Sequence, residues 1–107
     1  MYAEAASKHG AATNKGNASA ANRNYDKIMK VYAELARRGS GDLLQLSSLL
    51  ASDDDAVRAW AAAHLLKIAP EAAEPVLEQV AAKRGLVPFS ARMTLDQWRK
   101  GKLRLTE

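Results

Sequence analysis

A stretch with a clear helical period constrains the fold of this 107-residue chain more than any other feature. Between Tyr25 and Ala36 the apolar side chains recur every three or four residues, which places them on one face of a helix. Arg37 and Arg38 follow, where cations favour a helix C-terminus, and Gly39 suits the position just beyond the end. The stretch therefore predicts a helix that ends before Gly39. Its apolar face consists of Tyr25, Ile28, Met29, Tyr32, Leu35 and Ala36.

The N-terminal residues 1–17 give a weaker helical pattern. A helix can begin near Tyr2, but the glycines and asparagines of Gly10–Asn17 weaken it. Asn17 and Ser19 are both residue types that cap helices, so either one could begin the helix that contains Tyr25. We therefore predict an N-terminal helix of uncertain length, followed by a capped second helix.

Leucines and aspartates mark the middle of the chain. Gly39–Asp42 is expected to be a short turn, after which leucines predict a helix of about three turns. Ser52 and Asp55 have the spacing of a capping box, with Asp in place of the usual Glu, and so predict the start of another helix. Proline at position 70 ends that helix, because proline disfavours helix in the residue before it. The leucines are Leu43, Leu46, Leu49 and Leu50.

The last third predicts two more helices and a tail. Pro70 or Pro75 begins the first, since proline is tolerated in a first turn. Leu86–Ser90 is interpreted as a linker that packs against the protein, and the final helix runs from about Phe89 to Lys100. Residues 102–107 are expected to form a short tail. The count is five or six helices joined by short turns, and no segment has a convincing strand pattern.

Composition agrees with an all-α fold. Alanine is abundant, β-branched residues are sparse, and 107 residues fit a single domain, 1–107. The chain contains no cysteine, so it has neither disulfides nor thiolate ligands, which fits a reducing cytoplasm. No apolar run approaches the roughly 20 residues that cross a bilayer, and the N-terminus lacks a secretory pattern. We therefore expect a cytoplasmic protein without a membrane segment.

Leu46–Ala82 resembles a HEAT-type helical repeat. In such repeats the first helix ends in leucines, an Asp- or Pro-rich turn follows, and the second helix opens with Val-Arg and continues with small residues. The resemblance implies an all-α, right-handed α-α superhelix of the HEAT/armadillo type. It also implies that the turn aspartates and Arg58 can form hydrogen bonds between layers. The matching positions are Leu49, Leu50, Asp53, Asp54, Val57, Arg58, Ala61, Ala62 and Leu65.

A wider resemblance covers residues 22–103, carried by the segments NRNYDKIMKVYAEL, VRAWAAAHLLKIAPEAAEPVL and MTLDQWRKGKL. They look like a family of short bacterial proteins known only as a domain of unknown function, with an armadillo/HEAT-like fold. Some proteins of this kind are suspected immunity factors or small interaction proteins. The resemblance implies no catalytic residues.

Two features could carry chemistry. Asp53–Asp55 could bind a hard cation, but consecutive side chains at a helix start diverge, so helix capping is the favoured interpretation. His64 could be a general base or a ligand, but its position beside Trp60 and Val57 favours a hydrogen-bonded structural histidine. The sequence has no G-x-S-x-G, P-loop or dinucleotide-binding motif. We therefore expect no enzyme activity, no metal and no cofactor.

The remaining hypothesis is binding through a surface. Lys83–Arg104 contains seven cations and one acid, Asp96, a pattern that permits contact with nucleic acid. Some of these cations are simply the basic last turns of helices. We therefore favour an interaction with an unknown protein, specifically as a small immunity or adaptor protein, and keep nucleic-acid binding as the alternative. The net charge of +4 permits an acidic partner without requiring one, and a toxin partner in particular is expected to be acidic or membrane-active. The candidate interaction surface comprises Arg58, His64, Arg92, Trp98, Arg99, Lys100 and Lys102.

Overall fold

A computed structural model describes residues 1–103, and all of its regular elements in that range are helical. The predicted all-α class is therefore confirmed for this part of the chain, with six α-helices and one 3₁₀ helix. Arg104 and the rest of the predicted tail lie outside the described residues. In chain order the elements are α1 (Tyr2–Asn14), α2 (Ala18–Arg38), α3 (Ser40–Leu43), η1 (Leu44–Ala51), α4 (Asp55–Leu65), α5 (Pro70–Ala81) and α6 (Leu86–Arg99).

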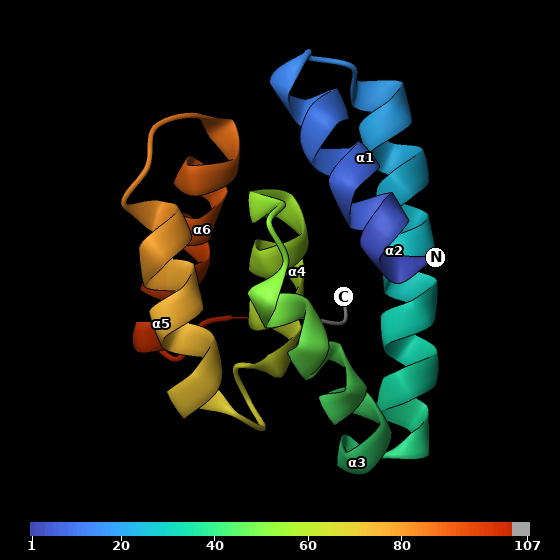
Figure 1. Cartoon of the computed structure of the whole chain (residues 1–107), viewed down its shortest axis with the longest axis vertical. Coiled ribbons are helices and arrows are strands. Elements are labelled where there is room, and N and C mark those ends of the chain that lie inside the picture. The colour runs from blue at the N-terminus through green and yellow to red at the C-terminus, as the bar shows by residue number, and fades with distance from the viewer. Residues whose placement is uncertain (104–107) are drawn as a thin grey trace.

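Helix α4 occupies the centre of the molecule. Figure 1 shows it between two helix pairs, α1 with α2 on one side and α5 with α6 on the other. Helix η1 also packs against α4 and connects it, through α3, to the end of α2. The core is continuous across these layers: Ile28 from α2, Leu65 from α4, and Leu77 and Val80 from α5 are fully buried.

The N-terminal helix is longer than its sequence pattern indicates. It continues through Gly10 to Asn14, and the chain turns at Gly16 with a left-handed φ of 71°. Asn17, rather than Ser19, caps α2: its side-chain oxygen accepts a hydrogen bond of 3.0 Å from the backbone N–H of Ala20. Gly10 does not break α1 because it is a packing position, where the absence of a side chain lets α1 approach α4.

The leucine segment differs from the prediction. The expected turn at Gly39–Asp42 is largely the single helical turn α3, and the expected α-helix is the 3₁₀ helix η1. A 3₁₀ helix has three residues per turn, so side chains three apart lie above one another. Leu43 and Leu46 are accordingly buried, whereas Leu44 is exposed.

The start of α4 is capped by a different residue from the one predicted. Asp54, not Ser52, is the N-cap, and its Oδ1 accepts hydrogen bonds from the N–H groups of Ala56 (2.8 Å) and Val57 (3.3 Å). Ser52 instead accepts a hydrogen bond from the backbone of Asp54 (3.1 Å). The predicted capping box is therefore wrong, and the helix begins at Asp55, slightly later than a cap at Ser52 would place it.

The C-terminal helices also refine the prediction. Pro70, not Pro75, begins α5. The predicted linker Leu86–Ser90 is wrong, because these residues form the first turns of α6 after Gly85, whose φ is 121°. Pro88 does not interrupt the helix, since its missing N–H falls in the first turn. Within residues 1–103, no helix is both long and apolar enough to span a membrane.

The close approach at Gly10 gives the first testable prediction. A Cβ added at Gly10 would lie 2.5 Å from the Cβ of Ala56, so Gly10→Ala forces α1 away from α4. We expect the free energy of unfolding to fall by about 1–3 kcal/mol, although alanine is the better helix former. Chemical denaturation measures this loss.

Two further variants test the cause of that loss. Gly41→Ala is the matched control, because a Cβ there meets nothing within 4 Å, and its stability should stay the same or rise slightly. The double variant Gly10→Ala/Ala56→Gly should lose less stability than the sum of its two single variants. Strict additivity would show that the two residues do not clash.

Candidate functional site

His64 lies in the core and not on the surface to which the sequence assigned it. Its exposed fraction is 2%. The hydroxyl of Tyr2 on α1 and Nδ1 of His64 share a hydrogen bond of 2.7 Å, and the ring of Tyr32 on α2 stacks on the imidazole at 4.0 Å. His64 must therefore be removed from the candidate surface. Its contacts agree with the structural interpretation and join α4 to both helices of the N-terminal pair.

Burial changes the ionisation of this cluster. It lowers the pKa of His64 to about 4 and, together with repulsion from Tyr32, raises the pKa of Tyr2. At neutral pH the imidazole and the phenol are therefore both uncharged, and their hydrogen bond joins two neutral groups.

Arg58 links two helices. Its guanidinium lies 2.6 Å from Oδ1 of Asp55 and 3.2 Å from Oε1 of Gln79 on α5. Lys83 also reaches Asp55, at 2.9 Å. Burial raises the pKa of Asp55, but hydrogen bonds from Arg58 and Lys83 outweigh this effect, so the pKa lies below its ordinary value. Arg58 is therefore held in the α4–α5 contact, where its side chain is only 16% exposed.

Three of the other predicted surface cations, Arg92, Arg99 and Lys100, also interact with protein groups. Arg92 donates hydrogen bonds to the backbone carbonyls of Ala81 (2.6 Å) and Lys83 (3.2 Å), which end α5. Arg99 lies 3.5 Å from carboxylate oxygens of both Glu74 and Glu78 on α5, and Lys100 lies 3.1 Å from Asp96. These three cations are therefore paired within the protein, which leaves less unpaired positive charge on α6 than the sequence suggests.

The last two predicted site residues lie near the end of α6. Trp98 is half-buried and packs against the core, whereas Lys102 is exposed and follows the helix. The seven predicted residues thus do not form one surface. His64 is buried in the core, and Arg58 bridges two helices. The other five lie on or just after α6, where all but Lys102 contact acids, backbone carbonyls or the core.

An exposed apolar stripe on α6 was missed by sequence reasoning. Leu86, Phe89 and Met93 are 51%, 52% and 45% exposed, and their spacing of three and four residues puts them on one face. We call these three residues the α6 surface. The spacing was visible in the sequence, but the interpretation of Leu86–Ser90 as a linker concealed it.

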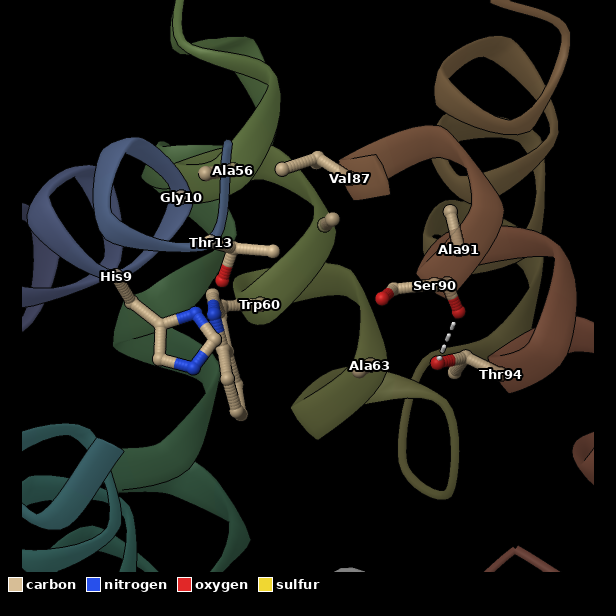
Figure 2. Close-up of a pocket in the computed structure, with 11 residues that line it drawn as sticks. His9, Gly10, Thr13, Ala56, Trp60, Ala63, Val87, Ser90, Ala91 and Thr94 are labelled. Carbon is tan, nitrogen blue, oxygen red and sulfur yellow. Dashed lines mark hydrogen bonds between the residues drawn. The ribbon is translucent and has the colours of Figure 1, made fainter. Parts of the chain in front are cut away.

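A cavity of about 210 Å³ lies beside this surface, between α1, α4 and α6. Figure 2 shows Trp60 on its α4 wall, His9 of α1 beside the indole, and Val87 and Ser90 opposite on α6. The rings of His9 and Trp60 meet edge to face, 5.2 Å apart, and burial lowers the pKa of His9. We call this cavity the Trp60 pocket.

The polar groups of the Trp60 pocket are few. Thr94 donates its hydroxyl proton to the backbone carbonyl of Ser90 at 3.0 Å. The hydroxyl groups of Ser90 and Thr13 and the ring of His9 also border the cavity. Among residues 1–103, no group of three or more His, Asp or Glu side chains is placed to hold a metal ion. The arrangement is suited to binding a small apolar group.

Comparisons with known proteins identify the family. The sequence matches the family model described as Domain of unknown function (DUF2019) over residues 1–98, so the chain belongs to this family. The match includes the N-terminal helix, which the resemblance over residues 22–103 had left out. A similar solved structure is that of the protein RPA1889 from Rhodopseudomonas palustris CGA009, with a TM-score of 0.87 and 25% sequence identity. That alignment covers 98% of this chain and 88% of the other. No curated protein matches the sequence.

The buried histidine predicts a dependence of stability on pH. Because the pKa of His64 is about 4 in the folded state and about 6.5 when unfolded, the unfolded chain binds the proton more tightly. The contribution of uncharged His64 to the free energy of unfolding is present above pH 6.5 and is lost as the pH falls toward 4. Between pH 7 and pH 5, denaturation should show a loss of about 2 kcal/mol.

His64→Gln provides the control for this pH effect. The variant removes the titrating group but leaves His9 in place, so its loss over the same interval should be much smaller. Equal losses in the variant and the wild type would show that His64 is not the group responsible.

Proposed function

We propose that this protein is a non-enzymatic protein–protein interaction module that acts in the cytoplasm, and that the α6 surface is its contact site. The observation that carries the proposal is the exposure of Leu86, Phe89 and Met93 on one face of the last helix. Single exposed apolar residues are normal on soluble proteins, whereas a group of them on one face is typical of interaction sites.

The architecture we propose is a right-handed, HEAT- or armadillo-like superhelix. The supporting features are the antiparallel helix pairs that pack side by side, and the match of Val57, Arg58 and Ala61 to the second helix of a repeat. A terminal helix of such a stack normally presents a polar outer face. The apolar outer face of α6 is therefore what a partner, continuing the stack, would cover.

The charges around α6 indicate what kind of partner would fit. Arg84 precedes the helix and is exposed, and the guanidinium of Arg92 stands 5.9 Å from the centre of the Phe89 ring. The first turn of α6 contains no acid. A complementary partner would present an apolar patch with an acidic rim, which attracts the arginines and raises the association rate. More specifically, we propose that this protein is itself a small immunity or adaptor protein.

Substitutions on α6 test the proposal. Phe89→Ser combined with Met93→Ser should weaken capture of a partner from native cells by about 30-fold or more, the loss of one interface hot spot. Leu44→Ser is the matched control, because Leu44 is equally exposed (43%) but lies on η1, and capture by this variant should be unchanged. Circular dichroism confirms that each variant is folded.

The nature of the captured partner and the salt dependence of its binding test the proposal further. The captured partner should bind the purified protein more slowly at high salt, because salt screens the arginines. The association rate should change more than the dissociation rate. Equal capture by the α6 variant and the Leu44 variant would contradict the proposed contact site. Recovery of DNA or RNA in place of a protein, with affinity falling steeply with salt, would support the nucleic-acid alternative instead.

A further inference from the structure

The Trp60 pocket has the size of a site for one aromatic ring. Its volume of about 210 Å³ exceeds the roughly 150 Å³ of an engineered apolar cavity that holds benzene in another protein. It is smaller than the roughly 300 Å³ at which pockets for drug-sized ligands begin. A single ring with a small substituent therefore matches the volume.

The walls of the pocket suit an aromatic group. The indole of Trp60 provides one side, and aromatic rings attract each other beyond the effect of burial alone. The methyl groups of Ala59 and Ala63 on α4 and of Ala91 on α6 line the rest, and leave space because none extends beyond Cβ. Figure 2 shows this space between the Trp60 side chain and α6.

The pocket is neutral but contains hydrogen-bonding groups. No Asp, Glu, Lys or Arg lines it, and the lowered pKa of His9 keeps that imidazole uncharged at neutral pH. In the described part of the chain, the hydroxyl groups of Thr13 and Ser90 form no hydrogen bond to another protein group. Because the pocket contains no charged group, it favours an uncharged ligand. Its hydroxyl groups favour a ligand with one polar substituent, as in other pockets that combine apolar walls with a few polar groups.

We propose that the Trp60 pocket binds one neutral aromatic ring that carries a hydrogen-bonding group, as a phenol does. The ring lies among the alanine methyl groups against Trp60, and its hydroxyl bonds with Thr13 or Ser90. The ring belongs either to a free small molecule or to a tyrosine side chain. This inference is separate from the α6 surface, because none of Leu86, Phe89 and Met93 lines the pocket.

Amide and indole NMR signals of the labelled protein test the proposal with p-cresol as the probe. We expect p-cresol to shift the Trp60 indole N–H signal with a Kd on the order of 1 mM, and to leave that of Trp98, which does not line the pocket, in place. Toluene, without the hydroxyl, and cyclohexanol, without the aromatic ring, should each bind about three- to tenfold more weakly.

Filling the pocket should abolish the shift. Ala63→Leu extends a side chain into the cavity and should weaken p-cresol binding at least tenfold, and Ala59→Leu is the second such variant if the first folds poorly. Ala72→Leu is the matched control, since Ala72 is exposed on α5, and it should bind like the wild type. N-acetyltyrosine amide distinguishes the sources: binding at least as tight as p-cresol identifies a tyrosine side chain, and binding of p-cresol alone identifies a free small molecule.

Three results would overturn this proposal. The first is an unchanged Trp60 signal at 10-fold the expected Kd of p-cresol, about 10 mM. The second is an equal shift in a folded Ala63→Leu or Ala59→Leu variant. The third is cyclohexanol binding as tightly as p-cresol. None of these results bears on the α6 surface, so the pocket and the proposed protein contact can fail independently.

Discussion

The close packing of small side chains around α4 is the constraint on which the rest of the structure depends. Helix α4 contacts α1, η1, α5 and α6, and five of its eleven residues are alanine. Large side chains on every face of α4 would keep the neighbouring helices far from its axis. Alanine side chains let the helix axes approach more closely. At Gly10 even one extra methyl group on α1 would collide with Ala56. The contact of α1 with α4 is close at this point because neither residue carries a side chain larger than a methyl group.

The same small residues explain why the molecule has a pocket. Gly10 and Ala56 bring α1 and α4 into contact, whereas a space remains between α4 and α6 beside Trp60. Alanine methyl groups are too short to fill the resulting space, so it remains open between three helices. The close contact at Gly10 and the open Trp60 pocket both result from the small residues on these helices.

Much of the fold could be predicted from local chemistry. The apolar period of α2 and its end at Gly39, and the start of α5 at Pro70, follow from interactions within a few residues, and all are present. One error arose where a distant contact decides the outcome, and another where a local signal for a helix start was overlooked. Gly10 looks like a helix breaker until Ala56 is placed against it, and Leu86–Ser90 looks like a linker until Gly85 and Pro88 are seen to begin a helix.

The candidate site was less predictable than the fold for a related reason. A cluster of cations in sequence says nothing about acids that approach from another helix, as Glu74 and Glu78 approach Arg99. The position of His64 on α4 indicated an inner face, but only the tertiary structure brings Tyr2 and Tyr32 to its ring. The pocket residues on α4 and on α6 each follow a helical spacing, but nothing in the sequence indicates that these two faces meet each other and α1.

The central place of α4 has a consequence for how the chain opens. Because this helix forms part of the contact surface of both helix pairs, neither pair can detach without exposing apolar residues of α4 such as Val57 and Leu65 to water. Partial opening is therefore costly in either half, and the two halves are coupled although few contacts join them directly. The backbone amides of α4 should accordingly exchange with solvent only when the whole domain unfolds, while the outer helices α2 and α6 exchange through smaller local fluctuations.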